Sequence, residues 1–201
     1  MAQVSIETLQ ATDVPQAAKV AARAFSTNPL SVAVYREQTD KLRQVQASFT
    51  HLLETVPGEV YVAKKGNEVV GMLRFIEWPH CQVSFIETLI NLPPMLIRLR
   101  GMALRTFKAR YIWLKHHPGE PHWHLGPVAV APEEQGQGIG TQLLERFCKH
   151  VDRTGQPAYL ETDKPENVRL YQRFGFSVKG EALVLGERNW FMWRPRRDAH
   201  Q

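Results

Sequence analysis

The segment at residues 128–141 constrains the fold more than any other part of the chain. It starts with apolar residues typical of a strand, continues through a turn with Gly136, Gly138 and Gly140, and ends where apolar residues recur at helical spacing. Backbone N–H groups at a helix start lack partners within the helix, and the helix dipole adds partial positive charge there. A strand, a glycine-rich turn and a helix start in this order predict a site for a phosphate-bearing cofactor.

The apolar residues after this turn predict a helix that packs one face against the body of the protein. They are Ile139, Leu143, Leu144, Phe147, Cys148 and Val151. The residues before the turn, 122–131, are expected to form a strand that leads into it.

Length and composition indicate one ordinary globular domain. The chain has 201 residues, of which 43% are hydrophobic and 22% charged, which is enough for one well-filled α/β core but short for two. The predicted organisation is therefore a single domain, residues 1–201. The net charge of +5 would suit a phosphorylated cofactor or a nucleic acid. Because the basic residues are spread along the chain, no nucleic-acid partner is expected.

The N-terminus and the cysteines argue against several other classes of protein. The first residues show no basic segment followed by an apolar core, and no apolar run reaches membrane-spanning length. We expect a cytoplasmic protein without a membrane partner, acting as a monomer or homodimer. Cys81 and Cys148 are far apart in sequence and support neither a disulfide framework nor a cysteine-based zinc site.

The remaining periodicities predict a sheet flanked by helices. A first strand at residues 4–8 precedes a helix capped by Asp13, and a second helix is expected over residues 30–55. Gly66 and Asn67 predict a hairpin turn, and Pro165 predicts the start of a short helix. The other expected strands are residues 59–64, 68–77, 157–162, 176–179, 182–185 and 189–194.

Residues 85–117 mix apolar and basic side chains and are divided by Pro93 and Pro94. They predict two helices, or one broken helix, inserted before the strand at 122–131. An amphipathic surface helix and a cap over the domain both fit this pattern. We expect a cap that contributes walls of the substrate pocket.

Two common phosphate-binding motifs fail in the glycine turn. A dinucleotide fingerprint starting at Gly136 requires glycine where Thr141 stands, and one starting at Gly138 fails in the same way. A Walker A loop requires lysine after its last glycine, where this chain again has Thr141. Residues 135–140 fit the pattern Arg/Gln-x-x-Gly-x-Gly/Ala instead. This pattern resembles the acetyl-CoA pyrophosphate loop of the GNAT superfamily of N-acetyltransferases.

Residues on both sides of the turn extend the resemblance. Asn167 and Tyr171 lie four residues apart on a predicted helix, as in the family's second cofactor-binding segment. In the family, the strand before the loop splays from its neighbour and binds the pantetheine arm through its backbone. The matching residues here are Val128, Ala129 and Val130.

The resemblance implies a GNAT fold. This would be one mixed α/β domain with a central, mostly antiparallel, splayed sheet of about six or seven strands flanked by helices, and with the helical insertion at 85–117. Residues 159–162, together with Asn167, Tyr171 and Trp190, are most similar to antibiotic acetyltransferases of the puromycin N-acetyltransferase kind.

The resemblance also implies roles for single residues. Asn167 would bond the pantetheine, and Tyr171 would donate a proton to the departing thiolate, since the pKa values of a phenol and a thiol are close enough. The structural alternatives are local backbone bonding for Asn167, core packing beside Phe174 for Tyr171, and plain turn geometry for the glycines. The pyrophosphate loop would consist of Gln135, Gly136, Gln137, Gly138, Ile139, Gly140 and Thr141.

An acceptor amine must lose a proton before it attacks a thioester. The candidate bases are Glu161 and His124 or His122, followed by Glu77. A histidine has a suitable ordinary pKa near 6.5, whereas a glutamate would need burial or a bridging water. His122 and His124 share one face of a strand. Because two ligands do not make a zinc site, no metal is expected.

Together these expectations describe an acyl-CoA-dependent N-acetyltransferase. It would move an acetyl group from acetyl-CoA to a primary amine of a small molecule by direct transfer in a ternary complex, with backbone N–H groups near residues 128–130 stabilising the oxyanion. Two alternatives remain open. One is a CoA-binding sensor or interaction module without turnover, and the other is an acetyltransferase for protein N-termini or lysines.

Overall fold

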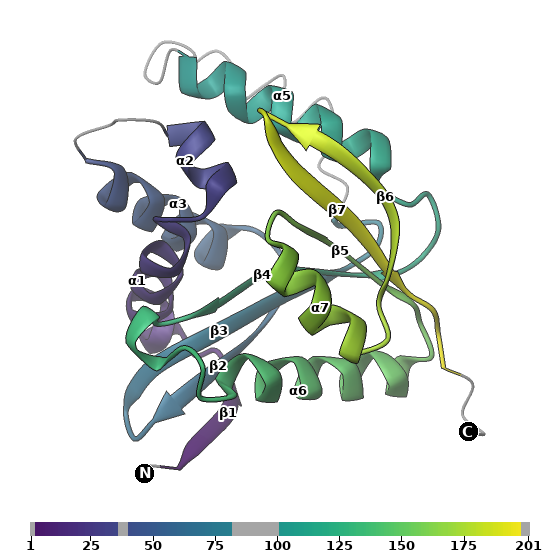
Figure 1. The fold of residues 1–201 in the computed structure, drawn as a ribbon. Coiled ribbons are helices and arrows are strands. Elements are labelled where there is room, and N and C mark those ends of the chain that lie inside the picture. The colour runs from purple at the N-terminus through teal and green to yellow at the C-terminus, as the bar shows by residue number, and fades with distance from the viewer. Residues whose placement is uncertain (1–2, 36–39, 82–100, 198–201) are drawn as a thin grey trace.

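The computed structural model describes residues 3–35, 40–81 and 101–197, with only the backbone at 101–103. Within these residues, seven strands form one sheet in the order β1-β2-β3-β4-β5-β7-β6 (Figure 1). All neighbouring strands are antiparallel except β4 and β5. The predicted mixed α/β fold with a mostly antiparallel sheet is confirmed. The strands are β1 Val4–Thr8, β2 Glu59–Lys65, β3 Glu68–Glu77, β4 Trp123–Val130, β5 Ala158–Thr162, β6 Ser177–Val184 and β7 Glu187–Arg194.

Helices cover both faces of this sheet. On one face, α6 and α7 pack over the strands, and on the other, α1 and α3 pack over β2, β3 and β4 (Figure 1). Because β3 is covered on both sides, its residues are apolar in succession rather than in alternation. The helices are α1 Val14–Phe25, α2 Pro29–Tyr35, α3 Lys41–Thr55, α5 Gly101–His116, α6 Ile139–Thr154 and α7 Pro165–Arg173.

The predicted apolar face of α6 is confirmed, because all six of its residues are buried. They face β3 and β4 within the larger hydrophobic core, where Phe75 contacts both Phe147 and Trp123 at ring-centroid distances of 5.2 and 5.5 Å. The start of α6, where the glycine turn ends, is therefore fixed by the packing of the helix on the centre of the sheet.

The predicted helix start at Asp13 is confirmed, since Asp13 is the N-cap residue of α1, whereas the single helix predicted over residues 30–55 is wrong. Residues 30–55 do not form one helix, because α2 ends at Tyr35 and Asp40, just before α3, has the non-helical angles φ −107° and ψ 29°. Asp13 does not cap α1 through its side chain. Its carboxylate instead accepts the N–H of Gln10 at 3.1 Å and pairs with Lys64 Nζ at 2.9 Å, because a short 3-10 turn precedes α1.

The two strand segments expected at 176–179 and 182–185 form one strand, β6. A register shift between Val178 and Gly180 against β7 marks a bulge. Gly180 interrupts the apolar pattern of the sequence, but the bulge accommodates the irregularity and β6 continues past it.

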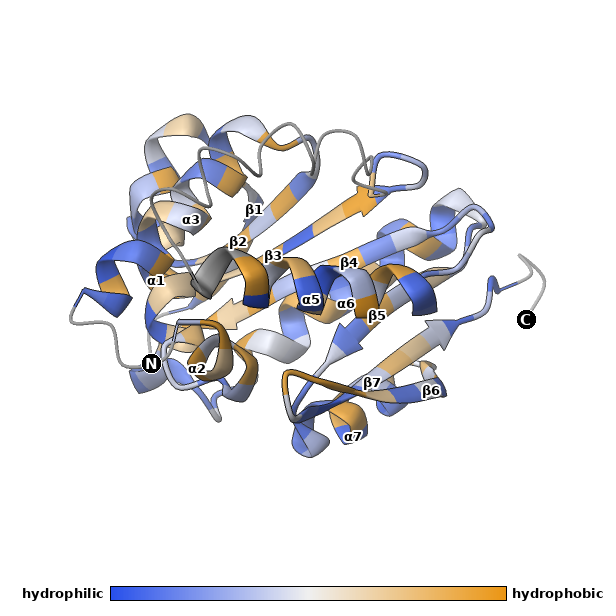
Figure 2. Cartoon of the chain, turned by 90° about the horizontal axis from the view of Figure 1, so that it is seen from above, coloured by the Kyte–Doolittle hydropathy of each residue, from blue (hydrophilic) through white to orange (hydrophobic). Residues whose placement is uncertain are grey.

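The predicted insertion is described only in part, because residues 85–100 lie outside the described residues. The remainder contains α5, which lies beside α2 and the tip of the β6–β7 hairpin (Figure 1). Seen from above, α5 carries both hydrophobic and hydrophilic segments (Figure 2). Its Ala109 is buried with Leu30 and Val184, and Trp113 Nε1 donates to Asn189 Oδ1 at 3.2 Å. None of the helices in the described part of the chain is long and apolar enough to cross a membrane.

Candidate active site

The sheet opens between β4 and β5. The two strands pair only at Trp123 with Ala158 and at His124 with Tyr159. Both strands are described in full, and β4 continues to Val130 and β5 to Thr162 beyond their last pair. The strands therefore diverge from His124 onward, and the splayed sheet that the sequence predicts is confirmed.

The edge of β4 that faces this opening carries backbone groups that β3 does not use. The N–H of Ala131 donates to the Val70 carbonyl of β3 at 2.9 Å. Because amide directions alternate along a strand, the N–H and C=O groups of Val128 and Val130 point away from β3, whereas those of Ala129 point toward it. The opening is thus lined by the backbone of two of the three strand residues that the sequence singles out.

A bulge in β4 precedes these residues. Leu73 of β3 pairs with Val128 and Phe75 pairs with Leu125, so that Arg74 alone faces the two residues 126–127. β4 tolerates Pro127 because of this bulge, since a proline has no N–H to give to the ladder. The bulge increases the local twist of β4 just where β5 leaves it.

The glycine turn ends β4 and starts α6. Gly136 and Gly138 both have φ of 79°, a left-handed conformation that glycine adopts without a steric penalty. Gly138 stands at the N-cap of α6, so the unpaired N–H groups of the first helical turn lie directly after it. At Gly140, a Cβ would meet only Val130 Cγ2 at 3.8 Å. Packing within the protein therefore leaves room at this position.

Ion pairs hold the turn against the rest of the protein. Arg23 of α1 binds Glu133 through two hydrogen bonds of 2.7 and 2.9 Å. Lys65 of β2 pairs with Glu134 and donates to Gln137 Oε1 at 3.1 Å. The sequence does not predict these contacts of Arg23 and Lys65, because no periodicity or motif links them to a turn so distant in the chain.

The side chain of Gln135 is turned toward β4. Its Nε2 donates to the carbonyl of Val130 at 3.1 Å. Gln135 thus occupies the carbonyl of Val130, the last residue of β4, and leaves the N–H of Val130 directed into the opening. In this structure Gln135 therefore links the loop to β4 through a hydrogen bond.

Asn167 and Tyr171 lie on α7, which follows β5. Asn167 Nδ2 donates to Thr162 Oγ1 at 3.3 Å, at the end of β5. Tyr171 is buried, and its ring contacts that of Phe176 at a centroid distance of 6.0 Å. Burial and the nearby charge of Asp163 raise the pKa of Tyr171 above its ordinary value. The phenol therefore stays protonated at neutral pH, and among the described residues its hydroxyl has no hydrogen-bond partner.

The two candidate bases His124 and Glu161 contact each other. His124 Nε2 and Glu161 Oε2 are 2.8 Å apart, and the two side chains are only 22% and 13% exposed. Burial alone would lower the pKa of His124, but the charges of Glu161 and Cys81 raise it to about 10. Burial would raise the pKa of Glu161, but His124 lowers it. At neutral pH the pair is therefore an imidazolium and a carboxylate.

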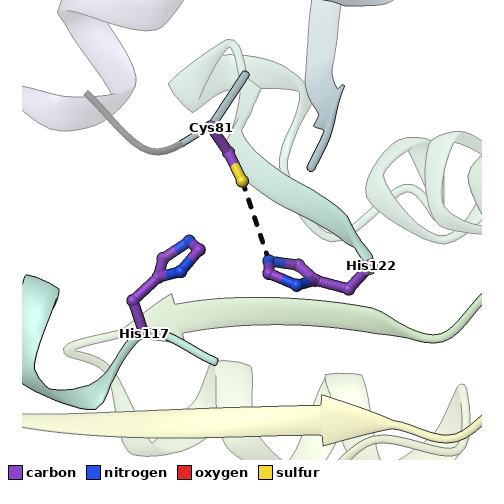
Figure 3. Close-up of side chains that lie close together, drawn as sticks. All are labelled: Cys81, His117 and His122. Atoms are coloured by element: carbon purple, nitrogen blue, oxygen red, sulfur yellow. Dashed lines mark hydrogen bonds between the residues drawn. The ribbon is translucent and has the colours of Figure 1, made fainter. Parts of the chain in front are cut away.

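The other two candidates do not contact Glu161, although the ring of His122 lies 6.4 Å from that of His124, centroid to centroid. Glu77 is at the exposed end of β3, where its Oε1 accepts a hydrogen bond from Gln156 Nε2 at 2.7 Å. His122 is fully buried and lies beside Cys81, with 3.8 Å between Sγ and Nε2, and close to His117 (Figure 3). Burial alone would raise the pKa of the Cys81 thiol, but the imidazoles around it lower it to about 5.

Neither Cys81 nor His117 is a site residue predicted from the sequence. Both precede β4 in the chain, and the return of the chain after α5 brings His117 next to His122. The spacing of His117, His122 and His124 was visible in the sequence. The proximity of Cys81 to these histidines is not visible in the sequence, since Cys81 lies in the turn that follows β3.

The geometry agrees with the comparison to known proteins. The family model described as Acetyltransferase (GNAT) family matches residues 26–176. The chain belongs to the GNAT family. The solved structure of "histone acetyltransferase HPA2 and related acetyltransferase" from Corynebacterium glutamicum is similar with a TM-score of 0.71, at 21% identity over 98% of this chain and 99% of that one.

Two further similar proteins extend this GNAT comparison. The structure of YncA from Salmonella typhimurium, solved with its cofactor acetyl-CoA, has a TM-score of 0.59 and 18% identity, covering 99% of this chain and 96% of that one. Mycothiol acetyltransferase of Paenarthrobacter aurescens is 39% identical over 71 residues, which are 32% of this chain and 22% of that protein. The chain spans about a quarter of the length of the curated relatives it matches, at 27% and 22% for two of them.

Proposed function

We propose that this protein is an acyl-CoA-dependent N-acetyltransferase that moves the acetyl group of acetyl-CoA to a primary amine of a small molecule, by direct transfer in a ternary complex. One observation carries the proposal. The edge of β4 at Val128 and Val130, which β5 leaves unpaired, leads through a short 3-10 turn at Pro132–Glu134 to the glycine turn and the N-terminus of α6, in a chain of the GNAT family.

The cofactor would lie along this edge. The pyrophosphate would accept hydrogen bonds from the N–H groups of residues 136–141, where the α6 dipole adds positive charge. The pantetheine arm would pair with the backbone of Val128 and Val130, with Ala129 as the spacer between them. Asn167, held by Thr162 at the far side of the opening, would bond the same arm.

The chemistry would take place where the strands diverge. The amine nitrogen attacks the thioester carbonyl carbon, and the oxyanion of the tetrahedral intermediate accepts a hydrogen bond from the N–H of Val128. The carbon–sulfur bond then breaks, and the thiolate takes the proton of the Tyr171 hydroxyl. Burial keeps the Tyr171 hydroxyl protonated at neutral pH, as the role of a proton donor requires.

For removal of the amine proton, we propose the His124–Glu161 pair. The 2.8 Å contact keeps the Glu161 carboxylate ionised, so it can accept a hydrogen bond from the amine and pass the proton to water. His124 would orient the carboxylate and discourage a second positive charge beside it. An amine next to an imidazolium is driven toward its neutral, nucleophilic form.

The acceptor pocket would be closed by the helical insertion. Its described part, α5, packs against α2 and the β6–β7 hairpin through Ala109 and Trp113, beyond the open end of the sheet. A cap of this kind suits a small acceptor. The resemblance to puromycin N-acetyltransferases adds aminonucleosides to the acceptors we propose, and the relative named for mycothiol adds small thiol-bearing ones.

Thiol release from acetyl-CoA tests the proposal. The full chain is incubated with acetyl-CoA and a panel of polyamines, amino acids, aminonucleosides, amino sugars and peptides, and the acetylated product is identified by mass spectrometry. We expect sustained turnover with one class of small amine. Preference for peptides would favour acetylation of proteins. Binding of acetyl-CoA without turnover over the whole panel would favour the sensor and contradict the proposal.

A further inference from the structure

We propose that Cys81, His117 and His122 bind a zinc ion. The three ligand atoms, one from each residue, lie within 4.8 Å of one another (Figure 3). They come from three separate positions: the turn after β3, the residue after α5, and the residue before β4. One thiolate and two imidazoles form a donor set that Zn²⁺ favours over hard cations such as Mg²⁺.

The hydrogen bonds of the two histidines leave the correct nitrogens for a metal. His122 Nδ1 lies 2.7 Å from the carbonyl oxygen of Glu120, and His117 Nδ1 lies 3.1 Å from that of Pro118. A carbonyl only accepts, so each Nδ1 carries the proton and each Nε2 presents a lone pair. Metal-binding histidines are usually fixed in this way by a backbone carbonyl or a carboxylate.

One of these lone pairs has nothing to bind. His117 Nε2 is buried and has no hydrogen-bond partner in the described part of the chain. A buried polar atom without a partner carries an uncompensated desolvation cost. A metal ion at this position would remove that cost. This atom points to a ligand independently of the short distances in the cluster.

The spacing is close to that of a bound ion. With a Zn–S bond of about 2.3 Å and a Zn–N bond of about 2.0–2.1 Å, tetrahedral geometry places sulfur and nitrogen about 3.6 Å apart. Cys81 Sγ and His122 Nε2 are 3.8 Å apart. Because Cys81 and His117 are only partly buried, an ion can reach the site, and small side-chain movements close the remaining gaps.

Three protein ligands leave the fourth position of a tetrahedral zinc open. His124 lies on the same face of β4 as His122, and its ring centroid is 5.3 Å from that of His117. A water or an acceptor group at the fourth position would therefore lie next to the His124–Glu161 pair. The ion would join the end of β3 to the start of β4 beside the proposed acceptor site.

Metal binding is tested without acetyl-CoA, so its outcome is independent of the proposed function. The full chain is treated with a chelator, and Zn²⁺ is then titrated in competition with a chromophoric chelator. Co²⁺ serves as the spectroscopic substitute. We expect one ion per chain, a thiolate-to-cobalt charge-transfer band, and protection of Cys81 from alkylation by Zn²⁺.

Matched variants make the test specific. Cys81→Ser should abolish the charge-transfer band, and His117→Gln should weaken binding of both metals, while Cys148→Ser should change neither. Thermal melting without metal shows whether each variant is folded. The proposal is overturned if the wild type binds no Zn²⁺ in the titration, or if the folded Cys81→Ser and His117→Gln variants bind as tightly as the wild type.

Discussion

The imidazole of His124 and the carboxylate of Glu161 lie 2.8 Å apart, at the point where β4 and β5 stop pairing. A pair of opposite charges in this position can hold an amine at the opening of the sheet. It also makes each partner a poor base by itself, because each stabilises the charged form of the other. The role of either residue is therefore a property of the pair.

Replacing Glu161 by glutamine should lower turnover. The amide keeps the shape of the side chain but carries no charge and cannot take up the amine proton. We therefore expect kcat to fall about 100-fold and the KM for the amine to rise. The Kd for acetyl-CoA, measured by calorimetry, should not change. Glu181→Gln, at an exposed position of β6, is the control. Unchanged kinetics in Glu161→Gln would remove the pair from the reaction.

Gly140 offers a direct test of the pyrophosphate loop. An aspartate there has room for its Cβ and, near the start of α6, should not destabilise the helix. Its charge should repel the pyrophosphate and weaken acetyl-CoA binding by at least about tenfold, since like charges in contact cost several kcal/mol. Gly140→Ala should bind acetyl-CoA almost normally. Equal Kd values for the two variants in calorimetry would mean that the cofactor lies elsewhere.

An ion pair between a buried arginine and a half-buried aspartate joins the end of β7 to α6. Arg194 is almost fully buried, donates from Nε to the Phe174 carbonyl at 2.8 Å and from Nη2 to Asp152 Oδ2 at 3.0 Å, and forms an ion pair with Oδ1 at 2.7 Å. Asp152→Ala would leave the guanidinium buried without its counter-charge. We expect the free energy of unfolding to fall by about 3–5 kcal/mol.

The control for this prediction is an exposed pair. Arg188 and Glu181 are 3.6 Å apart, with side chains 65% and 46% exposed, and Glu181→Ala should cost less than about 1 kcal/mol. Both variants are measured by denaturant unfolding. A similar loss for Asp152→Ala and Glu181→Ala would show that the buried pair does not stabilise the fold more than a surface contact.

Stability should depend on pH through Asp13. Burial alone would raise the pKa of Asp13, but Lys64 and the N–H of Gln10 lower it below its ordinary 3.8. A carboxyl whose pKa is lower in the folded state stabilises the fold above pH 3.8, and this contribution is lost as the pH falls through the folded pKa. Asp13→Asn should therefore lower the Tm at neutral pH, and the difference should shrink in acid. A difference that stays constant with pH would contradict the ionic contribution.

The sequence predicts most of the fold because its signals are local. The apolar run of β3, the hairpin at Gly66 and Asn67, and the apolar face of α6 each depend on residues close together in the chain. The start of α1 at Asp13 is also predicted, because an aspartate before a proline suits a helix start. What the Asp13 carboxylate binds is not predicted, because its partner Lys64 is far away in the chain.

The site is less predictable because it depends on residues far apart in the chain. Glycine spacing identifies the turn, but the ion pairs of Arg23 and Lys65 that hold it come from α1 and β2. Similarly, His124 and Glu161 are separate candidates in the sequence and become one ion pair only when β4 meets β5. Cys81 has no motif around it, and only the fold brings it to His122.

The central claim is acetyl transfer with Tyr171 as the proton donor, and steady-state kinetics of Tyr171→Phe test it most directly. The variant keeps the ring that packs on Phe176 and loses only the hydroxyl. With the best amine of the panel, kcat should fall by about 100-fold or more with little change in the Kd for acetyl-CoA. Tyr61→Phe, at a buried tyrosine of β2, should keep full activity. Near-wild-type turnover of a folded Tyr171→Phe would contradict the account.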